Sequence, residues 1–154
     1  MKIAVGAWLS NDLVANEREI SNLIDIAKAG QADMLIVGSE VLLRGDLTES
    51  QLIEYISRVK QAAPGIPVTT ADVYSQFMTH KAVVAAVDVI MANYFPYWEG
   101  IEVGKAVPYV HMRHKELVEK LKGKRLLFLN PVGPAKGNHD GQQFLRQTMR
   151  ASIS

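Results

Sequence analysis

The chain has 154 residues, of which 48% are hydrophobic and 21% charged, so it is long enough for one domain with a buried core. Its net charge of +1 gives no reason to expect binding to nucleic acid or to an anionic membrane. The absence of cysteine excludes disulfides and cysteine nucleophiles. No apolar run reaches the ~18 residues of a membrane span, and the apolar part of "MKIAVGAWLSND" is too short for a signal peptide. As it stands, the sequence indicates a cytoplasmic protein.

Short apolar runs alternate with helical patterns along the chain, which predicts an α/β fold built on a parallel sheet of strand–helix repeats. The whole of 1–154 reads as a single domain. The predicted strands are Ile3–Ala7, Met34–Val37, Val68–Ala71, Val89–Ala92 and Leu126–Leu129. The predicted helices lie within 16–30, 48–65, 81–87, 103–123 and 140–152.

Local signals mark several helix ends. Gly30 follows an apolar stripe and is a candidate C-cap. Thr48 and Gln51 form a capping-box pattern, which predicts that a helix begins there. Pro108 is expected near the first turn of the helix that follows the fourth strand.

Polar and aromatic residues follow the end of each predicted strand. They are Trp8, then Ser39 and Glu40, then Asp72, then Asn93, Tyr94, Tyr97, Trp98 and Glu99, and finally Asn130. The carboxyl ends of parallel strands meet at one edge of a sheet or one mouth of a barrel, where α/β proteins bind their ligands. Aromatic rings beside carboxylates and amides suit a sugar, because ring faces contact C–H groups while polar atoms bond the hydroxyls.

Structural roles for the same residues remain open. Glu40 is spaced to pair with Arg44, Asp72 is a possible helix N-cap, and the aromatic residues are candidates for packing under a loop. The histidines have no metal-ligand grouping, so we predict no metal site and no cofactor.

Three segments resemble glycoside hydrolase family 17, the (β/α)₈ enzymes that act on β-1,3-linked glucans. They are "IVGSEVLLRGDLT", "PVTTADVY" and "VDVIMANYFPYWEGI", and the likeness runs from about residue 3 to about residue 146. The resemblance implies that Glu40 is the general acid/base, and that Asn93, Tyr94, Tyr97 and Trp98 line a sugar cleft. The family has an asparagine before its acid, where this chain has Ser39.

The chain departs from the family at the nucleophile. The family places this glutamate in a "GETGWP"-like segment, whereas this chain reads "LNPVGPAKG" from Leu129. Aligning Pro134 with the family proline puts Asn130 at the nucleophile position and Gly133 at the tryptophan position. An asparagine cannot attack the anomeric carbon as an anion, so we expect catalysis to be weak or lost.

The chain is also short for a (β/α)₈ barrel, which needs ~250 residues. Its roughly five strand–helix units resemble the middle and later part of the family barrel, so we predict a partial barrel. Open strand edges invite pairing, and three outcomes remain open: a flattened sheet, two chains that cover each other's edges as a dimer, or a fragment of a longer chain. The functions weighed are a family 17-like β-glucan hydrolase with weak or no activity, a non-catalytic carbohydrate-binding domain, and a self-assembling structural domain.

Overall fold

A computed structural model describes residues 2–131, with side chains through residue 128. This part of the chain contains five strands and six helices. In order they are β1 (Ala4–Ala7), α1 (Leu13–Lys28), β2 (Met34–Ser39), α2 (Val41–Arg44), α3 (Glu49–Ala62), β3 (Val68–Val73), α4 (Tyr74–Thr79), α5 (Lys81–Ala86), β4 (Val89–Tyr94), α6 (Val103–Lys120) and β5 (Arg125–Pro131). The predicted helix at 140–152 lies outside the described residues.

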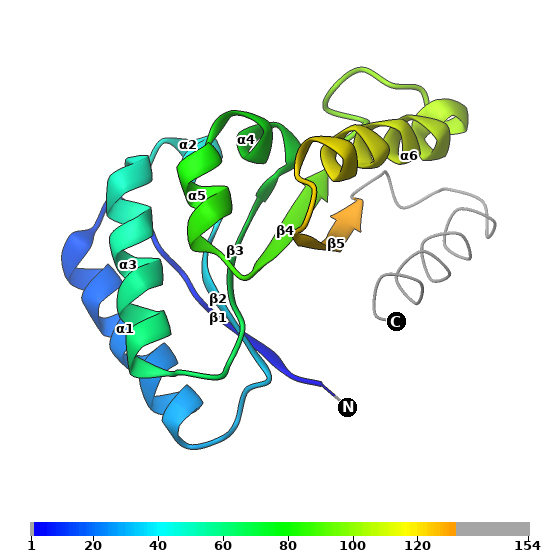
Figure 1. Cartoon of the computed structure of the whole chain (residues 1–154). Coiled ribbons are helices and arrows are strands. Elements are labelled where there is room, and N and C mark those ends of the chain that lie inside the picture. The colour runs from blue at the N-terminus through cyan, green and yellow to red at the C-terminus, as the bar shows by residue number, and fades with distance from the viewer. Residues whose placement is uncertain (1, 132–154) are drawn as a thin grey trace.

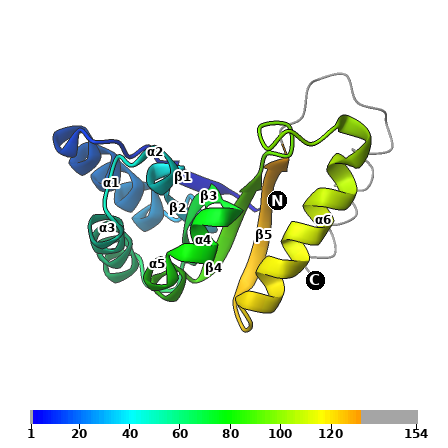
Figure 2. The same ribbon diagram turned by 90° about the horizontal axis from the view of Figure 1, so that it is seen from above.

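All strand pairs are parallel, and the order in the sheet is β1-β2-β3-β4-β5. Each strand therefore lies beside its neighbour in sequence, as in a (β/α) barrel, and the order does not reverse as in a doubly wound sheet. Figure 1 shows the row of strands, and Figure 2 shows the helices along one side of it, from α1 at one end to α6 at the other. The α/β class and the partial-barrel architecture predicted from the sequence are confirmed.

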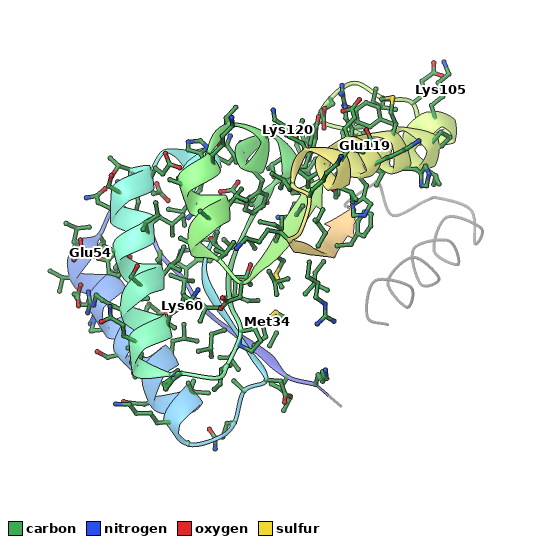
Figure 3. All side chains as sticks on the ribbon, in the orientation of Figure 1. Met34, Glu54, Lys60, Lys105, Glu119 and Lys120 are labelled. Atoms are coloured by element: carbon green, nitrogen blue, oxygen red, sulfur yellow. The ribbon has the colours of Figure 1, made fainter. Side chains whose placement is uncertain are left out.

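The two faces of β2 are unequally covered, whereas every residue of β3 and β4 is buried. Leu35 and Val37 of β2 are fully buried in the core against the helices, whereas Met34 and Ile36, between them in the strand, are only partly buried. Met34 lies on the side of the strands away from α3 in Figure 3. The core thus fills the space between sheet and helices, and no helix within residues 2–131 covers the opposite face.

The local signals at the helix ends form as the sequence predicts. Gly30, with φ of 70°, directly follows the C-cap residue of α1 and donates its N–H to the Ala27 carbonyl. Thr48 and Gln51 make both hydrogen bonds of the capping box at the start of α3. Pro108 differs from the prediction: it lies inside α6, at the sixth helical residue, where the first turn has already ended.

The helices α2 and α4 were not predicted. Both are short and begin directly after a strand, with no side-chain cap from their own N-cap residue. Between residues 2 and 131, no helix has both the length and the apolar character needed to cross a membrane.

Candidate functional site

The turn from β2 into α2 presents Glu40 with an unusual backbone. Glu40 has φ of 55° and ψ of 28°, and it is the one non-glycine residue with positive φ in the part of the chain that the structure describes. Gly38 precedes it with φ of 77°, and a Cβ at this position would lie 2.6 Å from Cγ2 of Val41. The Glu40 N–H donates to the Ala71 carbonyl of β3 at 2.7 Å. Left-handed backbone is costly for a residue with a Cβ, and such residues are common at functional sites.

Asn93 at the end of β4 holds the Glu40 carboxylate. Its Nδ2 donates to Oε1 of Glu40 at 3.0 Å, while its buried Oδ1 has no hydrogen-bond partner among residues 2–128. Because the amide is 5% exposed, that unpaired oxygen is a polar group that a ligand or a neighbouring group would stabilise. The alternative pairing of Glu40 with Arg44 does not form, since Arg44 pairs with Asp46 at 2.7 Å.

Asp72 of β3 forms a hydrogen bond to the same turn. It is fully buried, and its carboxylate accepts the N–H of Val73 at 2.7 Å and the N–H of Leu42 at 3.1 Å. Burial raises its pKa, and the backbone donors partly oppose that rise. Asp72 therefore does act at a helix N-terminus, but at that of α2, which is earlier in the chain, and not at the helix that follows its own strand. Its carboxylate is enclosed and bonds backbone N–H groups, so it is not exposed to bind a sugar.

An open pocket of about 650 Å³ lies beside Glu40. Its lining consists of Glu40, Leu43, Val73, Tyr74, Ser75, Phe95, Trp98 and Glu99. The residues come from the carboxyl ends of β2, β3 and β4 and from the segments that follow them. The pocket thus combines two carboxylates with aromatic and aliphatic surface.

The second carboxylate, Glu99, is held by tyrosines from two helices. Its Oε2 accepts from the hydroxyl of Tyr74 at 3.0 Å and from the hydroxyl of Tyr109. Arg113 Nε donates to the Tyr109 hydroxyl at 3.0 Å. Burial, together with the contacts to Tyr109 and Glu99, raises the pKa of Tyr74. The Tyr74 phenol therefore stays protonated at neutral pH and donates to Glu99.

The predicted aromatic residues divide into exposed and buried ones. Trp98 is 77% and Tyr97 57% exposed, and their rings meet edge to face at 5.8 Å. Tyr94 is 1% exposed, stacks on Tyr74 at 5.3 Å and bonds His114 Nδ1 through its hydroxyl at 3.0 Å. Trp98 therefore offers a ring face at the pocket, whereas Tyr94 is part of the packing beneath it.

A smaller pocket of about 210 Å³ lies at the ends of β1 and β2, and Trp8 and Ser39 are among its lining residues. The structure places the predicted site residues differently. Glu40 and Trp98 line the large pocket, and Trp8 and Ser39 line the small one. Asp72, Asn93 and Tyr94 are buried, and Tyr97 is exposed beside Trp98. Asn130 lies in β5, so its backbone ends at the same edge of the sheet, but its side chain is outside the described part of the structure.

Sequence reasoning missed Tyr74, Tyr109 and Arg113 as parts of this region, and it considered Arg44 only as an ion-pair partner of Glu40. Tyr109 and Arg113 are four residues apart on α6, a spacing that places them on one helix face. That spacing was the available signal, but the partner Glu99 lies in a loop and could not be paired with them from sequence. Within residues 2–131 no three histidine, aspartate or glutamate side chains gather in a way that would hold a metal ion.

Comparison with known proteins identifies the family. Residues 1–149 match the model of the BtgE/BtgC glycoside hydrolase domain. The glucan endo-1,3-β-glucosidase btgC of Emericella nidulans is 30% identical over 69% of this chain, and the probable btgC enzyme of Aspergillus terreus is 26% identical over 91%. The glucan 1,3-β-glucosidase of Saccharomyces cerevisiae is 32% identical over 64% of this chain.

Among solved structures, the family 17 β-1,3-glucanosyltransferase from Rhizomucor miehei superposes with a TM-score of 0.72 and 37% identity over 83% of this chain. An active-site mutant of that enzyme, in complex with laminaritriose, matches equally well. This chain spans 49% of the solved structure and 18%, 23% and 36% of the three curated relatives. The family 17 resemblance predicted from the sequence is confirmed, and the chain belongs to the BtgE/BtgC glycoside hydrolase domain family.

Proposed function

We propose that this chain is a domain for β-1,3-linked glucan in which Glu40 is the general acid and the nucleophile position is replaced. The observation that carries the proposal is the Glu40 carboxylate, held by Asn93 at the wall of a 650 Å³ pocket beside the exposed ring of Trp98. Relatives named as glucan 1,3-β-glucosidases and a structural neighbour with bound laminaritriose support the choice of glycan.

In this mechanism, a protonated Glu40 transfers its proton to the glycosidic oxygen as the bond from that oxygen to the anomeric carbon breaks. Asn130, at the position of the family nucleophile, cannot form the covalent intermediate. The remaining route is direct attack by water, with a carboxylate that removes its proton. Glu99 is the second carboxylate of the pocket and is the candidate for this base. A water route without a dedicated nucleophile is expected to be slow.

The alternative function is carbohydrate binding without turnover. Its support is the exposure of Trp98 and Tyr97, because two adjoining rings on the surface form a platform for the C–H faces of sugars. Binding of laminari-oligosaccharides that Trp98→Ala abolishes, with no cleavage over days, would favour this function over hydrolysis.

The decisive experiment incubates laminaripentaose with the chain, with Glu40→Gln and with a matched surface control, Glu54→Gln, on the outside of α3 (Figure 3). We expect slow cleavage by the wild type and the control, and none by Glu40→Gln. Cleavage that survives Glu40→Gln would refute the assignment of the acid. Inversion at the anomeric carbon would identify the water route, and loss of that activity in Glu99→Gln would identify its base.

Asn130→Glu tests the replaced position directly. A carboxylate there would restore the two-step reaction, so we expect faster cleavage with retention at the anomeric carbon. The gain should vanish in the double variant with Glu40→Gln. No gain, in a variant that unfolds like the wild type, would mean that the residue at 130 does not face Glu40.

We also propose that the chain self-associates as a dimer. β1 and β5 are the outer strands of the sheet, and each has one edge without a neighbouring strand among residues 2–131. Exposed apolar side chains lie near both ends of the sheet, on α1 (Leu13 and Val14) and on α6 (Met112 and Val118). Light scattering at tens of micromolar should give twice the monomer mass. A monomer mass throughout would contradict the proposal.

A further inference from the structure

Arg44 has a set of contacts that a surface arginine does not need. Its Nη1 donates to the Ser39 carbonyl at 2.6 Å and its Nη2 to the Leu9 carbonyl at 2.8 Å. Its Nε bonds the Asp46 carboxylate at 2.7 Å, and its guanidinium carbon lies 4.7 Å from the centre of the Trp8 ring. One side chain therefore uses all three of its nitrogens and one face.

These contacts lie beside residues that line the two pockets. Ser39 directly precedes Glu40, the residue with the left-handed backbone, and Leu9 directly follows Trp8. The Trp8 ring is 62% exposed, so few other contacts fix its orientation. The Arg44 guanidinium thus joins the segment after β1 to the end of β2. Each carbonyl that it bonds belongs to the residue next to Trp8 or Glu40 in the chain.

We propose that Arg44 is a positioning residue that holds the Glu40 turn in its left-handed conformation and orients the Trp8 ring. The catalytic meaning of this role rests on the function proposed for Glu40, but the positioning itself does not. Arg44 is not among the residues that line the pocket beside Glu40, so its side chain acts through the backbone and through Trp8.

The geometry requires arginine and not merely a positive charge. A guanidinium is planar and presents several N–H donors in a fixed fork, so it reaches two carbonyls, a carboxylate and a ring face together. The ammonium group of lysine is a compact charge without this fork. Lysine at position 44 should therefore fail to restore the role, whereas it would suffice if Arg44 supplied only charge or solubility.

The test compares Arg44→Lys and Arg44→Gln with the wild-type chain and with Arg58→Lys and Arg58→Gln. Arg58 is a matched control: it pairs with Glu17 at 2.7 Å and lies over the Tyr55 ring at 5.5 Å, far from Glu40 in sequence and fold. The amides of Glu40 and Leu42 are followed by hydrogen exchange, because both donate within the turn, to Ala71 and Asp72. The amide of Ile56 in α3 reports the stability of the rest of the chain.

We expect both Arg44 variants to exchange the Glu40 and Leu42 amides about tenfold faster or more, the effect of losing a charge-assisted hydrogen bond, with the Ile56 amide unchanged. The Trp8 indole N–H resonance should shift while that of Trp98 stays in place, with Trp8→Phe and Trp98→Phe to assign the two signals. The Arg58 variants should change none of these. Wild-type exchange and an unmoved Trp8 resonance in Arg44→Lys would overturn the proposal.

A laminaripentaose titration separates this inference from the proposed function. If the wild type binds the oligosaccharide, we expect weaker binding in both Arg44 variants and unchanged binding in the Arg58 variants. If the wild type neither binds nor cleaves it, the proposed function fails, and the exchange rates and the Trp8 resonance still decide the role of Arg44.

Discussion

The left-handed backbone at Glu40 makes a prediction about stability, because it should favour glycine over alanine at this position. At φ of 55° and ψ of 28°, a residue with a Cβ costs about 1–2 kcal/mol relative to glycine. The greater freedom of glycine in the unfolded chain offsets about 0.5–1 kcal/mol of this difference. Glu40→Gly should therefore be more stable than Glu40→Ala by about 1 kcal/mol. Both variants lose the same hydrogen bond to Asn93, so that loss cancels in the comparison.

The matched pair is Glu54→Gly and Glu54→Ala, at an exposed position in the interior of α3. There the order should reverse, because glycine in a helix interior is about 1 kcal/mol less stable than alanine. Urea unfolding of the four variants gives the two differences in free energy of unfolding, which should differ by about 2 kcal/mol. If glycine is the less stable residue at both positions, Glu40 has an ordinary backbone and the argument for a strained site is wrong.

Two further predictions concern the same end of the sheet. Gly38→Ala should lower the free energy of unfolding by about 2–4 kcal/mol, since its backbone is left-handed and the new Cβ would meet Val41 at 2.6 Å; Gly104→Ala, with open space around it, should not. Burial lowers the pKa of His114 to about 4 from 6.5. The unfolded chain then binds this proton first as the pH falls, so stability decreases between pH 6.5 and 4, by at most about 2 kcal/mol at pH 5. His114→Phe should reduce the difference between the urea midpoints measured at pH 7 and pH 5. If that difference is the same as in the wild type, the prediction is wrong.

The strands and their order follow from the sequence because the signals are local. Apolar runs between capped helices leave few alternatives, and Thr48 with Gln51 fixes one helix start through two short-range hydrogen bonds. By contrast, α2 is four residues long and lies between two glycines with positive φ, Gly38 and Gly45. Such a segment has the composition of a turn, and its helical form depends on Asp72, which is distant in sequence.

The pairing of Glu40 shows why the site was only partly predictable. Glu40 and Arg44 are four residues apart, which suggests an ion pair on a helix, but the left-handed backbone at Glu40 removes it from the helical spacing. Asn93 and Tyr94 are adjacent in β4, so their side chains point to opposite faces of the sheet. Both are buried, but strand alternation was the signal that would have placed them on different faces, with Asn93 toward Glu40 and Tyr94 toward Tyr74.

Among residues 2–128, the contacts that hold Glu40 come from β3 and β4. Ala71 and Asp72 of β3 bond the turn, Asn93 of β4 bonds the carboxylate, and none of these contacts involves β5. The described support of Glu40 therefore comes from strands other than the one that contains position 130. If Glu40 is the acid and Asn130 stands at the nucleophile position, the two roles belong to different strands, because Glu40 follows β2 while Asn130 lies in β5. Under that proposal, proton donation and nucleophilic attack can be tested separately, by substitutions at positions 40 and 130.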